Sequence, residues 1–305
     1  MFFYRMYGWK LCSDIDFFQL VKEEDCKDCP CAGEIQICED LDPEPLEQRK
    51  AEIGRGYEIL ENSGWLMNYT LWMKVENGNA IHYRRKEGAN EIYLRTYILG
   101  FGMAMLAMQR GALAIHCSAI SKNGKAVLIA GESGAGKSTV TKAFLENGYS
   151  LMADDMAVVT KAEDGVWVWP AYPFQKMCRD EVERAGFSPD EIYYIDEEKD
   201  KFMVPYKGEY SVNPVPLSGL LYLCKKASGD IEVQEVEGVQ KFFLCANNLF
   251  LRRLLKEGKY APYIGERCLW VAAAARMSCM IRSFRDSLPE KTAEKALAIV
   301  KSWED

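Results

Sequence analysis

The sequence lacks the features that mark several classes of protein. No run of eighteen apolar residues occurs in its 305 residues, so we expect no transmembrane helix. Positive charge is not in excess, and the net charge of −7 gives no support to binding of nucleic acid or of an anionic membrane. The chain has no internal repeat, and its N-terminus is too broken by charge to be a signal peptide. We therefore expect a cytoplasmic globular protein that binds neither nucleic acid nor membrane.

A glycine-rich segment at residues 131–138 carries the strongest functional signal. Its order, Gly-Glu-Ser-Gly-Ala-Gly-Lys-Ser, fits the pattern G-x-x-x-x-G-K-[ST] of phosphate-binding loops. The apolar run 125–130 predicts a buried strand before it, and the spacing over 138–147 predicts a helix after it. Backbone amides would then bind phosphate oxygens, Lys137 would reach the β- and γ-phosphates, and Ser138 would ligate Mg²⁺. The predicted nucleotide contacts are Gly131, Glu132, Ser133, Gly134, Ala135, Gly136, Lys137, Ser138 and Thr139.

Two adjacent aspartates, Asp154 and Asp155, follow soon after this loop. The predicted helix carries the chain about 15 Å away from the phosphates, and a predicted strand over 149–153 returns it by about 17 Å. We therefore expect a β-α-β unit that brings the pair back to the level of the loop. Adjacent residues at a strand end point to opposite sides, so one carboxylate can face a metal while the other acts as acid or base. By itself, an Asp-Asp pair more often forms a solvated turn.

His116 is one of only two histidines. It lies in an apolar run over 112–120, which predicts a strand that forms a hairpin with the loop strand through the turn 122–125. A histidine in such a strand is usually a core residue, so its pattern alone leaves packing and catalysis open.

The segment AIHCSAISKNGKAVLIAGESGAGKSTVTKAFLENGYSLMADD resembles the catalytic core of the HPr kinase/phosphorylase family, which has the phosphoenolpyruvate carboxykinase-like fold. The resemblance is specific over about residues 106–160. The layout of the chain, including YRMYGWKLCSDID near its start, is more similar to HPr-kinase-related proteins of biosynthetic clusters, some of which phosphorylate serine on lasso-peptide precursors. The resemblance implies an α/β (mixed α+β) fold with ATP and Mg²⁺ as cofactors. It also implies that Asp155 is the general base, that Asp154 helps Ser138 to hold Mg²⁺, and that His116 and Lys137 assist the transfer.

The resemblance and the loop together predict a kinase that transfers the γ-phosphoryl group of ATP to a serine-type hydroxyl of a peptide or small protein. The family's segment for phosphorolysis is not visible, so we expect no phosphorylase activity. A kinase of a free small-molecule hydroxyl and a nucleotide-binding regulatory module are the alternatives. A carboxykinase is disfavoured, because it needs a further Mn²⁺ site of histidine and lysine type, and the chain has only His82 and His116. Homo-oligomerisation is left open.

We expect two domains: a strand-rich N-terminal domain over 1–92 that grips the partner, and a nucleotide-binding catalytic domain over 93–305. The first should contain strands within 1–13, 34–38, 65–75 and 80–85, with a loop or helix over 40–55. A helix or helix pair over 93–110, with a break at 100–102, should connect the two. In the second, we expect strands over 165–172, 201–205 and 217–224, and helices over 176–185, 236–255, 269–285 and 291–303.

Two questions stay open in the sequence. Phosphoryl transfer gains from a guanidinium on the phosphate oxygens, and the candidates are Arg179, Arg252, Arg253, Arg276, Arg282 and Arg285, with Lys176 and Lys201 as further candidates for phosphate contact. The cysteines Cys26, Cys29, Cys31 and Cys38 lie close enough in sequence to hold zinc or an iron–sulfur cluster. Their spacing matches no defined motif, so we favour reduced thiols on a loop, and we expect no disulfide because nothing indicates secretion.

Overall fold

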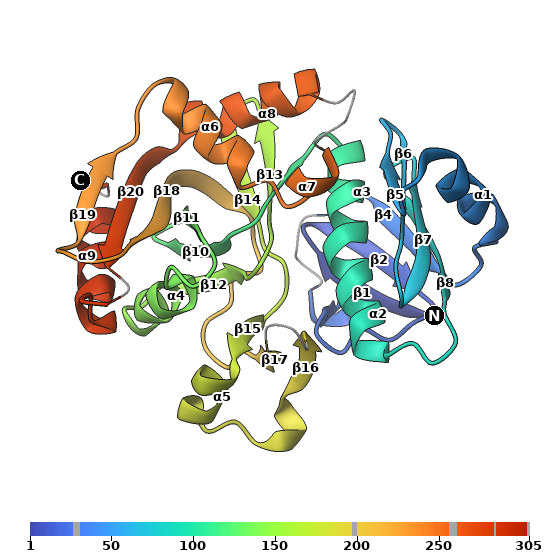
Figure 1. The fold of residues 1–305 in the computed structure, drawn as a ribbon, viewed down its shortest axis with the longest axis horizontal. Helices are drawn as coiled ribbons and strands as arrows, with labels where there is room; N and C mark the ends of the chain where they lie inside the picture. Colours follow the sequence, from blue (N-terminus) through green and yellow to red (C-terminus); the bar gives the residue numbers. More distant parts are fainter. Residues whose placement is uncertain (27–30, 197–199, 256–260, 284, 304–305) are drawn as a thin grey trace. The chain divides into compact units, whose positions relative to one another are not determined.

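The computed structural model of the protein describes residues 1–26, 31–196, 200–255, 261–283 and 285–303. It is a mixed α/β fold in which helices are interspersed between runs of strands (Figure 1). The backbone divides into two compact units: a first unit of Met1–Ala114, Phe174–Pro205 and Phe250–Ile264, and a second unit of Ile115–Pro173, Tyr206–Leu249 and Gly265–Asp305. The boundary expected after residue 92 falls within the first unit. That residues 1–92 and 93–305 are independently folding domains stays a prediction.

The first unit contains an eight-stranded sheet among its described residues, in the order β3-β1-β2-β4-β8-β7-β6-β5. Most of its strands lie in or near the predicted regions, where apolar and polar residues alternate and one face is buried. The predicted run 65–75 forms two strands, β6 and β7, and the strands β3 and β5 were not predicted. The bounds are β1 Phe2–Met6, β2 Trp9–Ser13, β3 Val21–Lys22, β4 Glu34–Cys38, β5 Tyr57–Ile59, β6 Ser63–Met67, β7 Leu71–Glu76 and β8 Ala80–Arg85.

A long helical segment packs against this sheet. Helix α2 (Glu91–Tyr97) continues through a π-helical turn (Ile98–Gly102) into α3 (Met103–Gln109), so the expected break at 100–102 is a local widening and not a separation. Gly102 lies close to the sheet, since a Cβ on it would lie 2.9 Å from the sulfur of Met73 on β7. The expected loop or helix at 40–55 is the helix α1 (Glu44–Ile53).

A small three-stranded sheet, in the order β15-β17-β16, completes the described part of the first unit. Its strands are β15 (Phe174–Cys178), β16 (Tyr193–Asp196) and β17 (Lys201–Pro205), with the helix α5 (Arg179–Ala185) beside them. The expected helix over 176–185 is wrong in its first three residues, because these pair with β17. The unit also contains α7 (Arg252–Leu255).

The second unit is built on a sheet in the order β12-β10-β11-β18-β14-β13-β9, with β20 paired to β18 and β19 to β20. Strands β11, β18 and β20 are mutually parallel, so their carboxyl ends meet at one edge. The bounds are β9 Leu113–Ile115, β10 Ser118–Lys122, β11 Lys125–Gly131, β12 Ser150–Ala153, β13 Ala157–Ala162, β14 Gly165–Trp169, β18 Val215–Lys226, β19 Glu232–Glu235 and β20 Arg276–Ser283.

Helices cover this sheet. Helix α4 (Lys137–Glu146) and helix α9 (Pro289–Lys301) pack through one apolar cluster onto β10, β11 and β18, with Val140, Phe144 and Ile299 among its members. Helices α6 (Val239–Asn247) and α8 (Ala261–Ala274) are drawn on the other side of the sheet from these two (Figure 1). Among the helices of the described residues, none combines the length and apolar character needed to cross a bilayer.

Two predicted elements of the second unit are corrected. The helix expected over 269–285 ends at Ala274, and the chain then forms the strand β20. The helix expected over 236–255 is interrupted after α6, where the carbonyl of Asn248 accepts a hydrogen bond from the amide of His116 at 2.7 Å. In contrast, the strand expected at 217–224 and the helix expected at 291–303 are confirmed within a few residues, as is the strand expected at 201–205, which belongs to the first unit.

Candidate nucleotide and phosphoryl-transfer site

The glycine-rich segment connects strand β11 to helix α4, as its sequence predicted. Gly131, Gly134 and Gly136 all have positive φ angles, of 148°, 72° and 98°. Gly131 is also constrained by close packing, since a Cβ on it would lie 2.4 Å from the carbonyl oxygen of Leu223 on β18. Glycine is therefore required for the chain to leave the sheet at this point. We call residues 131–136 the phosphate loop below.

Lys137 folds back over the phosphate loop. Its Nζ donates to the carbonyl of Gly131 at 2.8 Å and to that of Glu132 at 3.2 Å. The lysine and the first amides of α4 thus lie at one place, next to a helix N-terminus that favours anions.

The aspartate pair lies directly after strand β12. This strand pairs with β10, which itself pairs with β11 in the predicted hairpin, so β12 is separated from β11 by one strand within the β-α-β unit. The Ser118 hydroxyl donates to Asp154 Oδ1 at 2.7 Å. Asp155 has the left-handed backbone conformation, with φ of 68°, which turns the chain sharply after Asp154.

His116 contacts Asp155. Its Nδ1 lies 2.9 Å from the carbonyl oxygen of Asp155 and 3.6 Å from Asp155 Oδ1. A carbonyl oxygen can only accept, so Nδ1 carries the proton in this contact. The strand expected over 112–120 is in fact two strands, β9 and β10, with a bend at His116 and Cys117. That bend directs His116 toward the aspartates.

The Cys117 thiol shows how closely these groups gather. Its pKa is raised by burial above all, and the charges of Asp154 and Asp155 raise it further while that of Lys137 lowers it. The loop lysine and both aspartates therefore lie within electrostatic range of one buried side chain. The structure brings together the predicted groups of loop, lysine, aspartates and histidine within the second unit.

Two basic side chains also reach the phosphate loop. Lys225, near the end of β18, donates to the carbonyl of Ser133 at 2.7 Å. Arg282, near the end of β20, places Nη2 3.5 Å from the carbonyl of Gly134. Lys225 was not among the sequence candidates. Its position at the end of an apolar strand was a usable signal, because ligands bind at the carboxyl ends of parallel strands.

Four of the other arginine candidates are placed elsewhere. Arg179 pairs with Asp200 at 2.6 Å in the first unit, and Arg252 and Arg253 belong to α7 of that unit. Arg276 begins β20, at the opposite end of the strand from Arg282, and donates to the carbonyl of Ser302 at 3.3 Å.

The structure corrects one expectation about the cysteines of segment 26–38. Cys26 is disulfide-bonded, so the expectation that all cysteines are reduced is wrong there. Cys31 and Cys38 are free thiols, and Cys29 lies outside the described residues. Across the ranges that the structure describes, no three side chains of histidine, cysteine, aspartate or glutamate gather as a metal-binding group.

Comparison with known proteins supports the kinase resemblance. No family model matches the chain. Over 103 residues, which are 34% of the chain, the sequence is 28% identical to the HPr kinase/phosphorylase of Chlorobium limicola and to that of Chlorobium luteolum. Over this stretch the chain resembles the HPr kinase/phosphorylases. The match spans 29% of the length of each of these relatives. The solved HPr(Ser) kinase/phosphatase of Coxiella burnetii aligns with 62% of this chain and 98% of its own length, at 12% identity and a TM-score of 0.29.

Proposed function

We propose that this protein is an ATP-dependent kinase that transfers the γ-phosphoryl group to a serine-type hydroxyl of a peptide or small protein. The observation that carries the proposal is the contact of His116 Nδ1 with Asp155, directly after the strand that follows the phosphate loop and its helix. A simple nucleotide-binding module would need the loop and lysine, but it has no use for a second carboxylate held against a histidine. The relationship to HPr kinase/phosphorylases supports the same assignment.

The residues divide the task as follows. The amides of the phosphate loop and Lys137 bind and orient the phosphates, so that the γ-phosphoryl group is presented for in-line attack. Asp155 accepts the proton of the acceptor hydroxyl as its oxygen attacks. His116 holds the backbone of Asp155 through its Nδ1 proton and thereby fixes the position of the base.

The oxygen donors present fit a magnesium ion. Ser138 supplies a hydroxyl at the start of α4, and Asp154 supplies a carboxylate that Ser118 orients. Hard oxygen donors of this kind, together with phosphate oxygens, are those that Mg²⁺ prefers, and the ion when bound neutralises phosphate charge.

The first test is Asp155→Asn, assayed by transfer of radiolabelled γ-phosphate from ATP to candidate acceptors. Asparagine tolerates the left-handed backbone of this position, so the fold should be kept while the base is lost. We expect transfer to fall by a factor of about 10²–10⁴, the usual contribution of a general base, while ATP affinity changes little.

The matched control is Asp190→Asn, which removes an exposed carboxylate that belongs to the first unit and not to the unit of the site. Transfer by the Asp155→Asn protein at the rate of this control would show that Asp155 is not the base. Lys137→Ala serves as the binding control and should weaken both ATP binding and turnover. Label that appears on a free metabolite but on no peptide would replace the proposed acceptor class with a small molecule.

A further inference from the structure

Lys225 and Arg282 face each other on neighbouring parallel strands. In the register of β18 and β20, Lys225 is the partner of Arg282. Partners in a sheet project from the same face, and like charges placed directly opposite each other repel. An anion bound beside the two cations would offset this repulsion.

No anion of the protein fills that place in the part of the chain that the structure describes. Neither Lys225 nor Arg282 has a carboxylate within 4.0 Å, whereas the next residue, Lys226, pairs with Glu232. The Nε of Arg282 is buried and has no hydrogen-bond partner among the described residues. A buried guanidinium nitrogen without a partner is costly, so the side chain is arranged for a ligand that is added from outside.

Both cations point at the phosphate loop. Lys225 Nζ lies 3.6 Å, and Arg282 Nε 3.5 Å, from where a Cβ would stand on Gly134 and Gly136 respectively. Together with Lys137 they donate hydrogen bonds to the carbonyl oxygens of four successive residues, 131 to 134. Since the C=O and N–H of a trans peptide point in opposite directions, holding the Ser133 carbonyl turns the amide of Gly134 the other way, as an anion-binding loop requires.

We propose that Lys225 and Arg282 belong to the nucleotide site. They are neighbouring cations near the ends of β18 and β20, and the phosphates of a bound nucleoside di- or triphosphate compensate their charge. The inference rests on the proposed nucleotide site but not on phosphoryl transfer. It predicts that removal of one of the two cations has opposite effects on stability and on affinity. Stability of the ligand-free protein should rise, because repulsion between like charges is relieved, and affinity for the nucleotide should fall, because attraction for the phosphates is lost.

The test uses the full chain with Lys225→Met and Arg282→Met, and it measures ATP and ADP affinity in the presence of Mg²⁺ together with the ligand-free thermal midpoint. We expect the Kd for ATP to rise tenfold or more in each variant, while the ligand-free midpoint stays equal to that of the parent or rises. Lys226→Met is the matched control, and its Kd should stay within twofold of the parent. Lys225→Arg should retain most of the affinity, since it keeps the charge.

Two results would overturn the inference. One is an ATP Kd within threefold of the parent in both methionine variants. The other is a loss of affinity that follows a lowered ligand-free midpoint, which would assign the two residues to folding alone. A parent protein that binds ATP but transfers no phosphate to any acceptor would defeat the proposed function and leave this inference standing.

Discussion

Asp155 combines a position that local sequence spacing predicts with a backbone conformation that depends on long-range contacts. Its spacing from the loop predicted its place at the edge of the sheet, and the structure puts it there. Its left-handed backbone and its contact with His116 depend on a bend between β9 and β10 that arises from tertiary packing, since the amide of His116 bonds to Asn248, over 130 residues away along the chain. A pattern within the sequence carries no information about a contact of that length.

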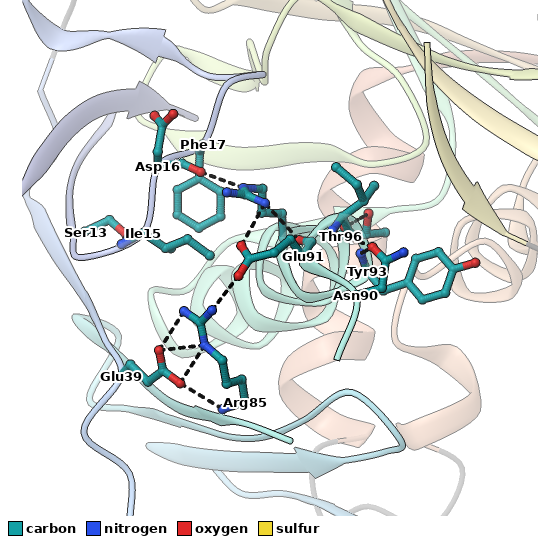
Figure 2. Close-up of polar contacts among 12 residues, drawn as sticks. Ser13, Ile15, Asp16, Phe17, Glu39, Arg85, Asn90, Glu91, Tyr93 and Thr96 are labelled. Carbon is teal, nitrogen blue, oxygen red and sulfur yellow. Dashed lines mark hydrogen bonds and ion pairs between the residues drawn. The ribbon is translucent and has the colours of Figure 1, made fainter. Parts of the chain in front are cut away.

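Glu39 is a second position where single-residue chemistry can be tested (Figure 2). It forms a bidentate contact with Arg85, with Nη2 at 2.7 Å from Oε2, and Arg85 in turn pairs with Glu91 at the start of α2. Burial raises the pKa of Glu39, but the hydrogen bonds and charge of Arg85 outweigh that effect and leave its pKa below the usual value.

We expect Glu39→Gln to destabilise the protein by about 0.5–1 kcal/mol at pH 7, as for a partly exposed ion pair. A carboxyl whose folded pKa is lowered contributes stability above its unfolded pKa, which is about 4.3 for Glu. That contribution is lost as pH falls through the lower, folded value. The difference between parent and variant, measured by urea unfolding, should therefore be full at pH 6–7 and shrink below about pH 4.

The exposed Glu87 provides the control, because its change to Gln should have little effect at either pH. A difference for Glu39→Gln that is the same at pH 7 and at pH 3.5 would mean that the carboxylate charge is not what stabilises this contact.

Among the elements, the phosphate loop and its flanking strand and helix could be predicted because their signals are local. The strand β20 could not. Residues 269–285 are rich in alanine, methionine and arginine, which favour helices, and the helix does form as far as Ala274. Beyond it, Met277 and Met280 are buried in a position between β18 and β19, and pairing on both sides overrides the local preference. This misassigned strand carries Arg282, so the error in the element left that residue undistinguished among the six candidate arginines.

The contact between β11 and β18 is the element-level feature that fixes the loop, and Gly131→Ala tests it. A Cβ there would meet the Leu223 carbonyl at 2.4 Å, a backbone atom that cannot move aside without disturbing the parallel ladder. We expect a loss of about 2–4 kcal/mol from strain and overpacking combined, and a large loss of ATP affinity.

Gly124→Ala is the matched comparison, since Gly124 also has positive φ, of 71°, but has open space around its Cβ position. We expect it to cost only about 1 kcal/mol, the backbone effect alone. Equal midpoints of thermal unfolding for the two alanine variants would argue against the steric account of Gly131.

At the scale of the whole molecule, the two units are interleaved along the chain. The first unit takes three separate stretches of sequence, and the second takes the three stretches between and after them. The boundary predicted near residue 92 follows the end of the strand-like runs in the sequence, and no such local signal marks the returns at 174 and 250. Those returns depend on packing within the first unit, where Phe18 stacks on Tyr193 with ring centroids 4.0 Å apart.

This interleaving makes the fragment 93–305 a decisive test of the boundary predicted after residue 92. The fragment keeps α3 but lacks strands β1 to β8, against which α3 packs. Met103 and Leu106 of α3, both fully buried in the intact protein, would lose that cover. We expect the fragment to bind a hydrophobic dye and to unfold without a cooperative transition, while the full chain, purified in parallel, unfolds cooperatively. Cooperative unfolding and ATP binding by the fragment would instead establish 93–305 as an independent catalytic domain.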